Sequence, residues 1–387
     1  MEKGRRIRIL IVDDSAVMRS LVRSALSHDP GLEITGTAGD GESALSAVES
    51  LRPDLVLLDV EMPVMDGLVT LKKLRARGHK IPVIMCSSLT QRGAKVTIEA
   101  LANGASDYVA KPANQSGREA AIQTLSQELI PKIRALAGAS SAVPSIVFPG
   151  SGGGGVFGVK PGSTRIPVIA PLPAKSQAIT ATPLGVVIGV STGGPAALDL
   201  LLPMLPANFP LPVMIVQHMP ELFTKVFAER LNCRCAMTVL EAGEGEPLLP
   251  GKVYIAKGNW HMEILPPSRI GSPSTLHLTQ DPPENHCRPA VDVLFRSAAR
   301  IYGSGVLAVM LTGMGSDGLA GSRMIRENGG TVLAQDQETS VIWGMPGAVT
   351  HAGLAQRVLP LQSIAGEIIR IVRRPRCEVH EPLETVG

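Results

Sequence analysis

The stretch that decides the fold of the C-terminal half is Leu184–Pro195, LGVVIGVSTGGP. Its apolar first part predicts a buried strand that ends at Ser191. Gly193 and Gly194 then predict a tight turn, and Pro195 stands where the first turn of a helix tolerates proline. Free backbone amides at such a helix start can face developing negative charge. The stretch therefore indicates an α/β unit and a candidate site on the same turn.

Three interpretations of this turn compete. Residues 189–193, GVSTG, match G-x-S-x-G, the pattern of a nucleophile on a sharp strand-to-helix turn. The same stretch fits a phosphate-binding loop of the dinucleotide type, with Ser191 in place of a glycine, and it also fits a plain tight turn. Because short glycine motifs often arise by chance, the motif alone does not separate the three.

Length and composition limit the classes of protein. The 387 residues suffice for two domains with full cores, and a net charge of +3 gives no sign of a nucleic-acid binder. Five cysteines argue against a disulfide framework, and the spacing of Cys233 and Cys235 is not a usual zinc spacing. The first apolar run stops at Asp13, too early for a signal peptide, and prolines interrupt the uncharged residues 200–216. We expect a cytoplasmic protein that is not membrane-embedded.

Residues 1–137 alternate short apolar segments with helical patterns. This alternation predicts a doubly wound, five-stranded parallel sheet of flavodoxin-like type. Strands are expected at Ile7–Val12, Glu33–Thr37, Asp54–Leu58, Pro82–Cys86 and Asp107–Val109. A last helix is expected at Ser116–Ala137. Ligands of such sheets bind beyond the carboxyl ends of the strands.

Polar side chains gather at those strand ends. Asp13 and Asp14 follow the first strand, Asp59 the third, Ser87 the fourth and Lys111 the fifth. Converging carboxylates repel one another unless a cation joins them, and oxygen ligands suit Mg²⁺. A lysine and a hydroxyl beside them can hold the oxygens of a phosphoryl group. A single acidic residue there could be only a helix cap, but the combined set favours a phosphoryl site.

Motifs around these residues resemble the receiver domain of two-component response regulators: IVDDS, LLDVEMPVMDGL, the serine after PVIMC, and DYVAKP. The resemblance covers about residues 5–130. It implies that Asp59 accepts a phosphoryl group and that Mg²⁺ binds Asp13, Asp14, Asp59 and the Glu61 backbone.

The same resemblance implies how phosphorylation is sensed. Ser87 matches the switch hydroxyl, Lys111 the residue that contacts the phosphoryl group, and Tyr108 the switch aromatic. Tyr108 also fits a surface aromatic on an edge strand. Val64 departs from the family, where a basic or polar residue is common, but does not affect the chemistry.

The rest of the chain changes character twice. Residues 138–183 are rich in Gly, Ser, Ala and Pro, which predicts a linker. Residues 184–375 form a second α/β pattern, and residues 376–387 a tail. The segment between Lys252 and Leu278 suggests antiparallel strands added to a parallel sheet. Strands are expected at Leu184–Val190, Pro212–Val216, Lys252–Ile255, Met262–Leu265, Thr275–Leu278, Gly305–Thr312 and Thr331–Ala334, and helices at Pro195–Leu202, Glu221–Leu231, Ala290–Tyr302, Asp317–Asn328 and Leu361–Arg373.

Two tests separate the interpretations of Ser191. A dinucleotide site needs an acidic residue at the end of the second strand. Here the second strand, residues 211–216 (LPVMIV), is followed by Gln217 and His218 instead. A nucleophile needs a base and an orienting acid at the same sheet edge, where His218 and Asp317 are expected. A triad of Ser191, His218 and Asp317 is therefore favoured, with amides near Thr192 and Met314 as a candidate oxyanion hole.

Competing interpretations remain for both proposed partners of Ser191. His218 alone could bond to backbone, and Asp317 alone could cap its own helix. Other histidines, His261, His286 and His351, are also candidates. The chain order Ser–His–Asp differs from the usual order of α/β hydrolases.

With the triad assembled, the C-terminal half resembles the catalytic domain of chemotaxis protein-glutamate methylesterases. GVSTGGP, VQHMP, RPAVDVLF, LTGMGSDG and AQDQETSVIWGMPGAV carry the resemblance. It implies the triad of Ser191, His218 and Asp317, an oxyanion contact from the Met314 amide, a place for Thr192 in the site, and no cofactor for the esterase.

The implied reaction is hydrolysis of glutamate γ-methyl esters on methyl-accepting chemoreceptors, with deamidation of receptor glutamines at the same site. A chemotaxis histidine kinase would supply the phosphoryl group, and the unphosphorylated receiver would cover the Ser191 edge. The alternative is a phosphorylation-gated docking module without catalysis.

Overall fold

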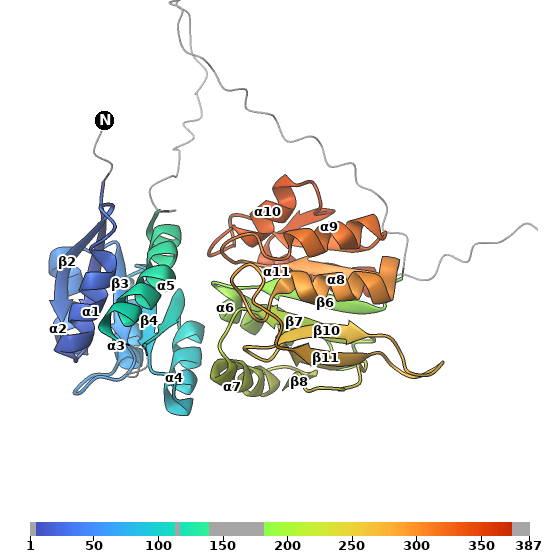
Figure 1. Cartoon of the computed structure of the whole chain (residues 1–387). Coiled ribbons are helices and arrows are strands. Elements are labelled where there is room, and N and C mark those ends of the chain that lie inside the picture. The colour runs from blue at the N-terminus through green and yellow to red at the C-terminus, as the bar shows by residue number, and fades with distance from the viewer. Residues whose placement is uncertain (1–4, 113–116, 139–181, 374–387) are drawn as a thin grey trace, which may run out of the picture.

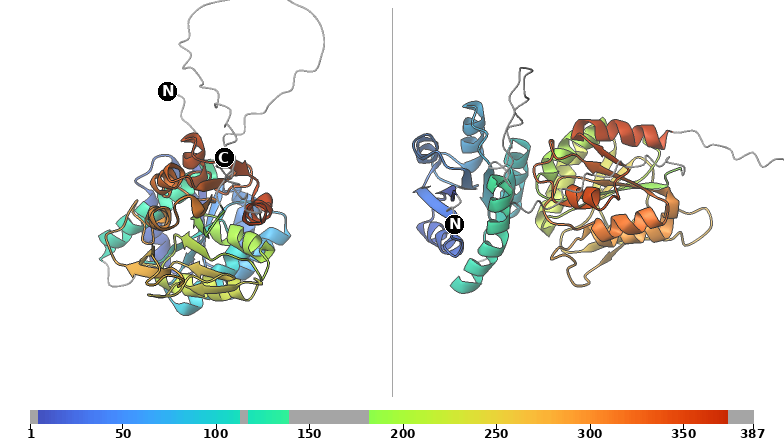
Figure 2. Two further views of the ribbon diagram at one scale, coloured as in Figure 1. Left: turned by 90° about the vertical axis from the view of Figure 1, so that its right-hand side faces the viewer. Right: turned by 90° about the horizontal axis from the view of Figure 1, so that it is seen from above.

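The structure, a computed structural model, describes residues 5–112, 117–138 and 182–373. These residues form two α/β units that lie side by side (Figures 1 and 2). Nearly all of the predicted linker 138–183 and the whole predicted tail 376–387 lie outside the described residues. None of the described helices has the length and apolar character that a bilayer span requires.

The N-terminal unit is the predicted five-stranded parallel sheet, in the order β2-β1-β3-β4-β5. β3 and β4 are buried along their whole length because helices cover both faces of the sheet. Side chains cap four of the helices, and Ser15 caps the first of them. The elements are β1 (Ile7–Val12), α1 (Ala16–Leu26), β2 (Leu32–Ala38), α2 (Gly41–Leu51), β3 (Leu55–Asp59), α3 (Gly67–Ala76), β4 (Val83–Ser87), α4 (Gln91–Ala102), β5 (Asp107–Ala110) and α5 (Arg118–Gly138).

The C-terminal unit contains a seven-stranded parallel sheet in the order β14-β13-β12-β6-β7-β9-β8. The strands are β6 (Gly185–Val190), β7 (Val213–Gln217), β8 (Thr238–Glu241), β9 (Lys252–Ile255), β12 (Val306–Met310), β13 (Thr331–Gln335) and β14 (Arg357–Leu359). The helices are α6 (Gly194–Leu201), α7 (Glu221–Asn232), α8 (Val291–Tyr302), α9 (Leu319–Glu327), α10 (Met345–His351) and α11 (Leu361–Val372), and two short 3₁₀ turns are η2 (Leu202–Met204) and η3 (Gly303–Gly305).

One part of the predicted topology is corrected. β9 pairs in parallel with both β7 and β8, so it belongs to the main sheet rather than to a hairpin. The antiparallel pair is β10 (His261–Leu265) with β11 (Thr275–Thr279), which forms a separate two-stranded sheet packed on α8. The fold class, a parallel α/β unit with an antiparallel hairpin, is confirmed.

Three short elements were not predicted. β8 and β14 lie at the two edges of the sheet, where partly exposed residues weaken the apolar pattern of a strand. α10 is a short helix that begins Met-Pro-Gly, and its sequence does not show a helical period.

The arrangement of strands places a site at the end of β6. β6 is followed by its neighbour β7 on one side, whereas the adjacent β12 is followed by β13 on the other side, so the strand order reverses between β6 and β12. Such a switch point opens a crevice at the carboxyl ends of the strands. On the receiver side, α4 packs against α6 and α7, so this edge of the sheet faces the N-terminal unit (Figure 1).

Candidate active site

Ser191 lies directly after β6, on the turn into α6. Its N–H donates to the Thr312 carbonyl at 3.0 Å, and its carbonyl accepts from the Gly194 N–H at 2.8 Å. Gly193 has φ +79°, and a Cβ there would lie 2.6 Å from Cβ of Val341. Glycine alone satisfies both conditions, so the turn holds Ser191 in one fixed place.

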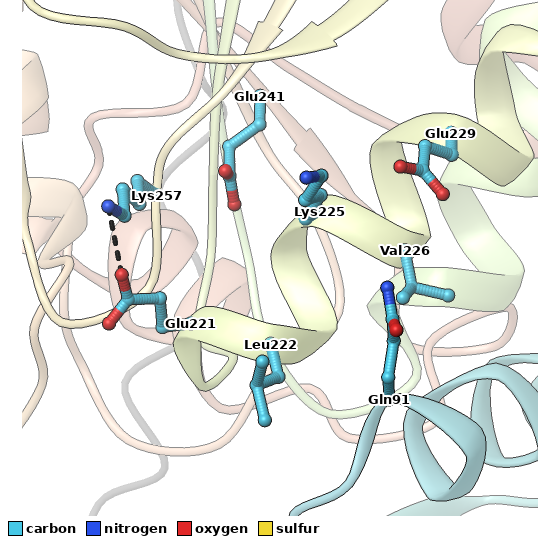
Figure 3. Close-up of a pocket in the computed structure, with 8 residues that line it drawn as sticks. All are labelled: Gln91, Glu221, Leu222, Lys225, Val226, Glu229, Glu241 and Lys257. Carbon is cyan, nitrogen blue, oxygen red and sulfur yellow. Dashed lines mark ion pairs between the residues drawn. The ribbon is translucent and has the colours of Figure 1, made fainter.

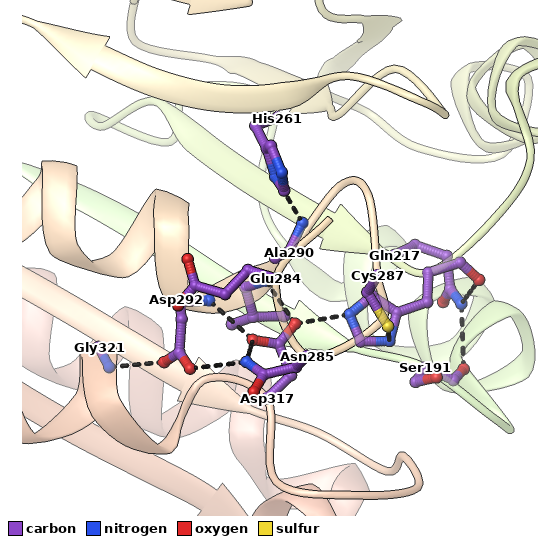
Figure 4. A network of polar contacts seen from close by, with 12 residues as sticks. Ser191, Gln217, His261, Glu284, Asn285, Cys287, Ala290, Asp292, Asp317 and Gly321 are labelled. Atoms are coloured by element: carbon purple, nitrogen blue, oxygen red, sulfur yellow. Dashed lines mark hydrogen bonds and ion pairs between the residues drawn. The ribbon is translucent and has the colours of Figure 1, made fainter. Parts of the chain in front are cut away.

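His218 and Asp317 are in direct contact, and Asp317 lies in a network of polar contacts with Asn285 and Asp292 (Figure 4). Nε2 of His218 lies 2.8 Å from Oδ2 of Asp317. The Asp317 carboxylate also accepts from the backbone N–H groups of Val291 at 2.7 Å and Asp292 at 3.0 Å, at the start of α8. Asp317 therefore does not cap its own helix, whose N-cap is Gly318 without a side-chain bond.

The environment of the pair sets its protonation. Burial raises the pKa of Asp317, but the hydrogen bond and charge of His218 and the α8 amides outweigh burial and hold that pKa below its ordinary value. Burial lowers the pKa of His218, but the contacts with Asp317 and Cys287 outweigh burial and raise that pKa to about 9. A carboxylate on Nε2 keeps a proton on that nitrogen and leaves Nδ1 as the proton acceptor of the neutral ring.

The Nδ1 side of His218 has a different neighbour. Sγ of Cys287 lies 3.6 Å from Nδ1. The structure describes the side chains of Ser191 and His218 and shows no hydrogen bond between them. Both residues nevertheless share a partner, because Nε2 of Gln217 donates to the Ser191 carbonyl at 3.0 Å and to the His218 carbonyl at 3.3 Å. Catalytic hydrogen bonds are often long until substrate is bound.

The competing histidines have other contacts. His261 accepts from the Ala290 N–H through Nδ1, and its Nε2 bonds to the Pro282 carbonyl, both at 3.2 Å. His351 packs edge-on against Trp343, and His286 lies exposed on a turn. Neither contact of His261 nor that of His351 involves a carboxylate, so His218 is the best-placed candidate base.

Thr192 and Met314 lie on two adjacent turns. The Thr312 hydroxyl donates to the Thr192 carbonyl at 2.9 Å and so ties the turns together. Within the part of the chain that the structure describes, the N–H groups of Thr192 and Met314 have no hydrogen-bond partner. Backbone N–H groups inside a protein nearly always have a hydrogen-bond partner. Two neighbouring N–H groups without one are therefore available to a ligand.

The receiver unit brings together its own predicted residues. Lys111 Nζ lies 2.8 Å from Asp13 Oδ2 and 2.8 Å from Asp59 Oδ1. Oδ2 of Asp59 is buried without a partner, and ligand atoms of Asp13, Asp14 and Asp59 lie within 4.8 Å of one another. Carboxylate oxygens at this spacing fit the oxygen coordination of Mg²⁺.

Burial raises the pKa of Asp59, and the charge of Asp13 adds to this effect, while Lys111 opposes it, so that the pKa is about 6. The Glu61 N–H donates to Asp59 Oδ1 at 3.3 Å. Ser87 is fully buried at the end of β4, and its hydroxyl bonds to the Ser88 carbonyl at 3.2 Å. The Glu61 backbone therefore contacts Asp59, and Ser87 lies at the end of β4, the strand that pairs with β3.

The two units join at the candidate site itself. The Thr192 hydroxyl donates to Oδ2 of Asp107 at 2.7 Å, and both residues are buried. Lys132 Nζ lies 3.1 Å from the same carboxylate oxygen. Tyr108 stacks on Phe223 with ring centroids 4.8 Å apart and planes at 12°. Tyr108 is therefore an interface aromatic, not a surface one.

Known proteins carry the same two parts in the same order. The family model described as response regulator receiver domain matches residues 9–123, and the model described as CheB methylesterase matches residues 186–368. A protein of Nocardioides sp. named protein-glutamate methylesterase/protein-glutamine glutaminase is 49% identical, over 96% of this chain and 96% of that protein. A protein of the same name from Trichodesmium erythraeum is 47% identical, over 94% of this chain and 99% of that protein.

The chain belongs to the protein-glutamate methylesterase/protein-glutamine glutaminase family.

A solved structure is also similar. The crystal structure of the Thermotoga maritima CheB methylesterase catalytic domain shares 45% identity and covers 50% of this chain and 100% of that domain, with a TM-score of 0.48. Membership in the methylesterase/glutaminase family makes this chain a response-regulator hydrolase of chemotaxis. The docking module is not favoured.

Sequence reasoning missed several residues around the methylesterase/glutaminase site. Asn285 Nδ2 donates to Asp317 Oδ1 and to Asp292 Oδ2, both at 3.0 Å, and Cys287 contacts His218 (Figure 4). Both lie just before the RPAVDVLF motif, so their proximity to that motif was the available signal. Asp107 and Phe223 gave no signal, because only the packing of the two units brings them to the site.

A hollow of about 310 Å³ lies along α7, beside the start of α4 (Figure 3). Its lining is mostly charged, and Lys257 Nζ forms an ion pair with Glu221 at 2.8 Å. The lining residues are Gln91, Glu221, Leu222, Lys225, Val226, Glu229, Glu241 and Lys257. This hollow lies next to the contact between the two units and is separate from Ser191, His218 and Asp317.

Proposed function

We propose that this protein hydrolyses glutamate γ-methyl esters on methyl-accepting chemoreceptors, releasing methanol, and deamidates receptor glutamines at the same site. Phosphorylation of its receiver by a chemotaxis histidine kinase in the cytoplasm controls the reaction. The observation that carries the proposal is the 2.8 Å contact between His218 Nε2 and Asp317 at the sheet edge that Ser191 occupies.

Ser191 is the nucleophile of this proposal. Its Oγ attacks the ester carbonyl while its proton passes to Nδ1 of His218, which acts as general base. The proton then leaves with methoxide as methanol, and water hydrolyses the acyl-serine by the same route to restore Ser191 and leave a glutamate. A glutamine side chain follows the same path with ammonia as the leaving group.

Asp317 orients the base. Its hydrogen bonds from the α8 amides fix the carboxylate, and its contact with Nε2 stabilises the imidazolium that forms during attack. The unpaired N–H groups of Thr192 and Met314 support an oxyanion hole, because amides with no other partner can stabilise the tetrahedral oxyanion.

Asp59 is the phosphate acceptor of the receiver. Mg²⁺ held by Asp13, Asp14, Asp59 and the Glu61 backbone would neutralise charge on the phosphoryl oxygens. Lys111, already paired with the Asp59 carboxylate, is placed to bind one of those oxygens. Ser87 is placed to respond to the phosphoryl group from the end of β4.

The contact between the two units acts as a gate that controls access to Ser191. In the unphosphorylated state the Asp107 carboxylate holds the Thr192 hydroxyl, and Tyr108 stacks on Phe223, so the receiver covers the Ser191 edge. Phosphorylation at Asp59 favours a receiver conformation in which Ser87 and Tyr108 rearrange. Loss of the stacking and hydrogen-bond contacts then shifts the population toward an open state.

Labelling with an organophosphonate ester separates this enzyme from a docking module. We expect label on Ser191 in wild type, more of it after addition of acetyl phosphate, and none in Ser191→Ala. Absence of label in both phosphorylation states, in a protein that folds and docks on receptors, would favour the docking module instead.

A further inference from the structure

We propose that Cys287 and His218 form a zinc(II) site that inhibits the hydrolase. Sγ of Cys287 lies 3.6 Å from Nδ1 of His218. Zinc bound to a thiolate at about 2.3 Å and to an imidazole at about 2.0 Å, with a tetrahedral angle between them, separates the two ligand atoms by about 3.5 Å. The two ligand atoms already lie at about that separation, so zinc can bridge them with only small adjustments of the two side chains.

Asp317 has the place of an outer-sphere partner. A histidine that binds zinc through one nitrogen commonly donates the N–H of the other to a carboxylate, which fixes the ring. Here Nε2 of His218 lies 2.8 Å from Asp317 Oδ2, while Nδ1 faces the thiol. The Asp317 contact that orients His218 as a base therefore also orients its ring as a metal ligand.

The cysteine is held in place by its own loop. Glu284 and Cys287 exchange two backbone hydrogen bonds, at 3.1 and 2.9 Å, across a turn formed by Asn285 and His286. Glu284 forms two 2.6 Å hydrogen bonds with Arg296 of α8, which anchors the loop. A fixed thiol loses little conformational freedom on binding a metal, and Cys287 is only partly buried, so an ion can reach it.

The chemistry of binding is a simple exchange. The Cys287 thiol gives its proton to solvent, the thiolate sulfur and the Nδ1 lone pair bond to zinc, and water fills the remaining positions. Nδ1 is the atom that takes the Ser191 proton in the proposed reaction, so its bond to zinc stops catalysis. The inhibitory effect thus rests on the proposed function, whereas the metal site itself does not.

The test uses full-length protein with saturating Mg²⁺ and acetyl phosphate, and cobalt(II) as a spectroscopic probe. Cobalt–thiolate bonds absorb in the near ultraviolet, while cobalt on the carboxylates of the receiver does not. We expect this absorbance in wild type and in a control with Cys233→Ala and Cys235→Ala, its loss in Cys287→Ala, and its disappearance when zinc is added.

Activity supplies the second readout. Each variant is compared with its own metal-free rate of methanol release, and the zinc concentration for half inhibition should rise at least tenfold in Cys287→Ala but not in the control. Equal inhibition of Cys287→Ala and wild type, or an absorbance that survives in Cys287→Ala, would overturn the site. Loss of the absorbance in Cys287→Ala with no zinc inhibition of wild type would support the metal site and contradict His218 as the base.

Discussion

The Thr192 hydroxyl donates a 2.7 Å hydrogen bond to the Asp107 carboxylate, so the residue next to the candidate nucleophile is tied to the receiver. Both side chains are buried, and Lys132 holds the same carboxylate. A hydrogen bond to a charged group contributes about 1.5–3 kcal/mol. This contact is strong enough to bias the two units toward the closed arrangement.

Asp107→Ala should therefore raise methanol release without a phosphodonor by about tenfold, the factor that about 1.4 kcal/mol represents. Asp54→Ala, which removes an exposed ion pair with Arg5 on the receiver, is the matched control and should not raise the rate. A basal rate in Asp107→Ala equal to that of wild type would remove Asp107 from the gate.

The stacked pair of Tyr108 and Phe223 is the second part of the gate. Stacked aromatic pairs contribute about 0.5–1.5 kcal/mol, so Phe223→Leu should raise the basal rate by a few fold. In a double-mutant cycle with Tyr108→Leu the two effects should be less than additive, because either change breaks the same contact. Strict additivity would mean that the rings act independently.

The pKa of His218 predicts a pH profile. The general base must be neutral, and the pKa of His218 is raised to about 9 by Asp317 and Cys287, which outweigh burial. Below that pKa the fraction of neutral ring falls about tenfold per pH unit, so kcat/KM should rise with pH, reach half of its limiting value near pH 9 and level off only above it. The measurement uses phosphodonor-saturated protein in buffer free of zinc, with Ser191→Ala as the blank for chemical hydrolysis.

Cys287→Ala should move that profile to lower pH, because the thiol contact is one cause of the raised His218 pKa. Without the thiol the protonated ring is less stable, so the pKa of His218 falls and more of the ring is neutral at pH 7. The kcat/KM profile of Cys287→Ala should therefore have its midpoint at a lower pH than that of wild type. A midpoint that stays the same would show that Cys287 does not influence the ionisation of His218.

Asn285 is a positioning residue for Asp317. Its amide bridges the carboxylates of Asp317 and Asp292, and its φ of +52° means that glycine preserves the backbone. Asn285→Gly should lower kcat by about tenfold with little change in KM and change the pH profile, because the two carboxylates lose their shared donor. An unchanged kcat and pH profile would leave Asn285 with only a structural role.

The strand-end pattern made most of this architecture predictable. Ser191, His218 and Asp317 each follow an apolar segment, and parallel strands bring such positions to one edge whatever their distance in sequence. The same argument places Asp13, Asp59 and Lys111 together. These positions depend on local periodicity, which the sequence displays directly.

The rest depends on packing between distant segments. The Thr192–Asp107 bond and the Tyr108–Phe223 stack exist only because α4 packs on α6 and α7, which no local pattern encodes. Asp317 resembles a cap for α9 in sequence, yet its partners are the amides of α8. In the sequence β9 is followed closely by β10 and β11, which suggested a set of antiparallel strands. In the structure β9 pairs in parallel with β7 and β8.

The most direct test of the account is methanol release from methylated receptor membranes, measured with and without acetyl phosphate for wild type, Asp59→Asn and Ser191→Ala. We expect a rate that rises with phosphodonor in wild type, a low rate without response in Asp59→Asn, and a loss of several orders of magnitude in Ser191→Ala. A near-normal rate in folded Ser191→Ala would contradict the proposal that Ser191 is the nucleophile of this hydrolase.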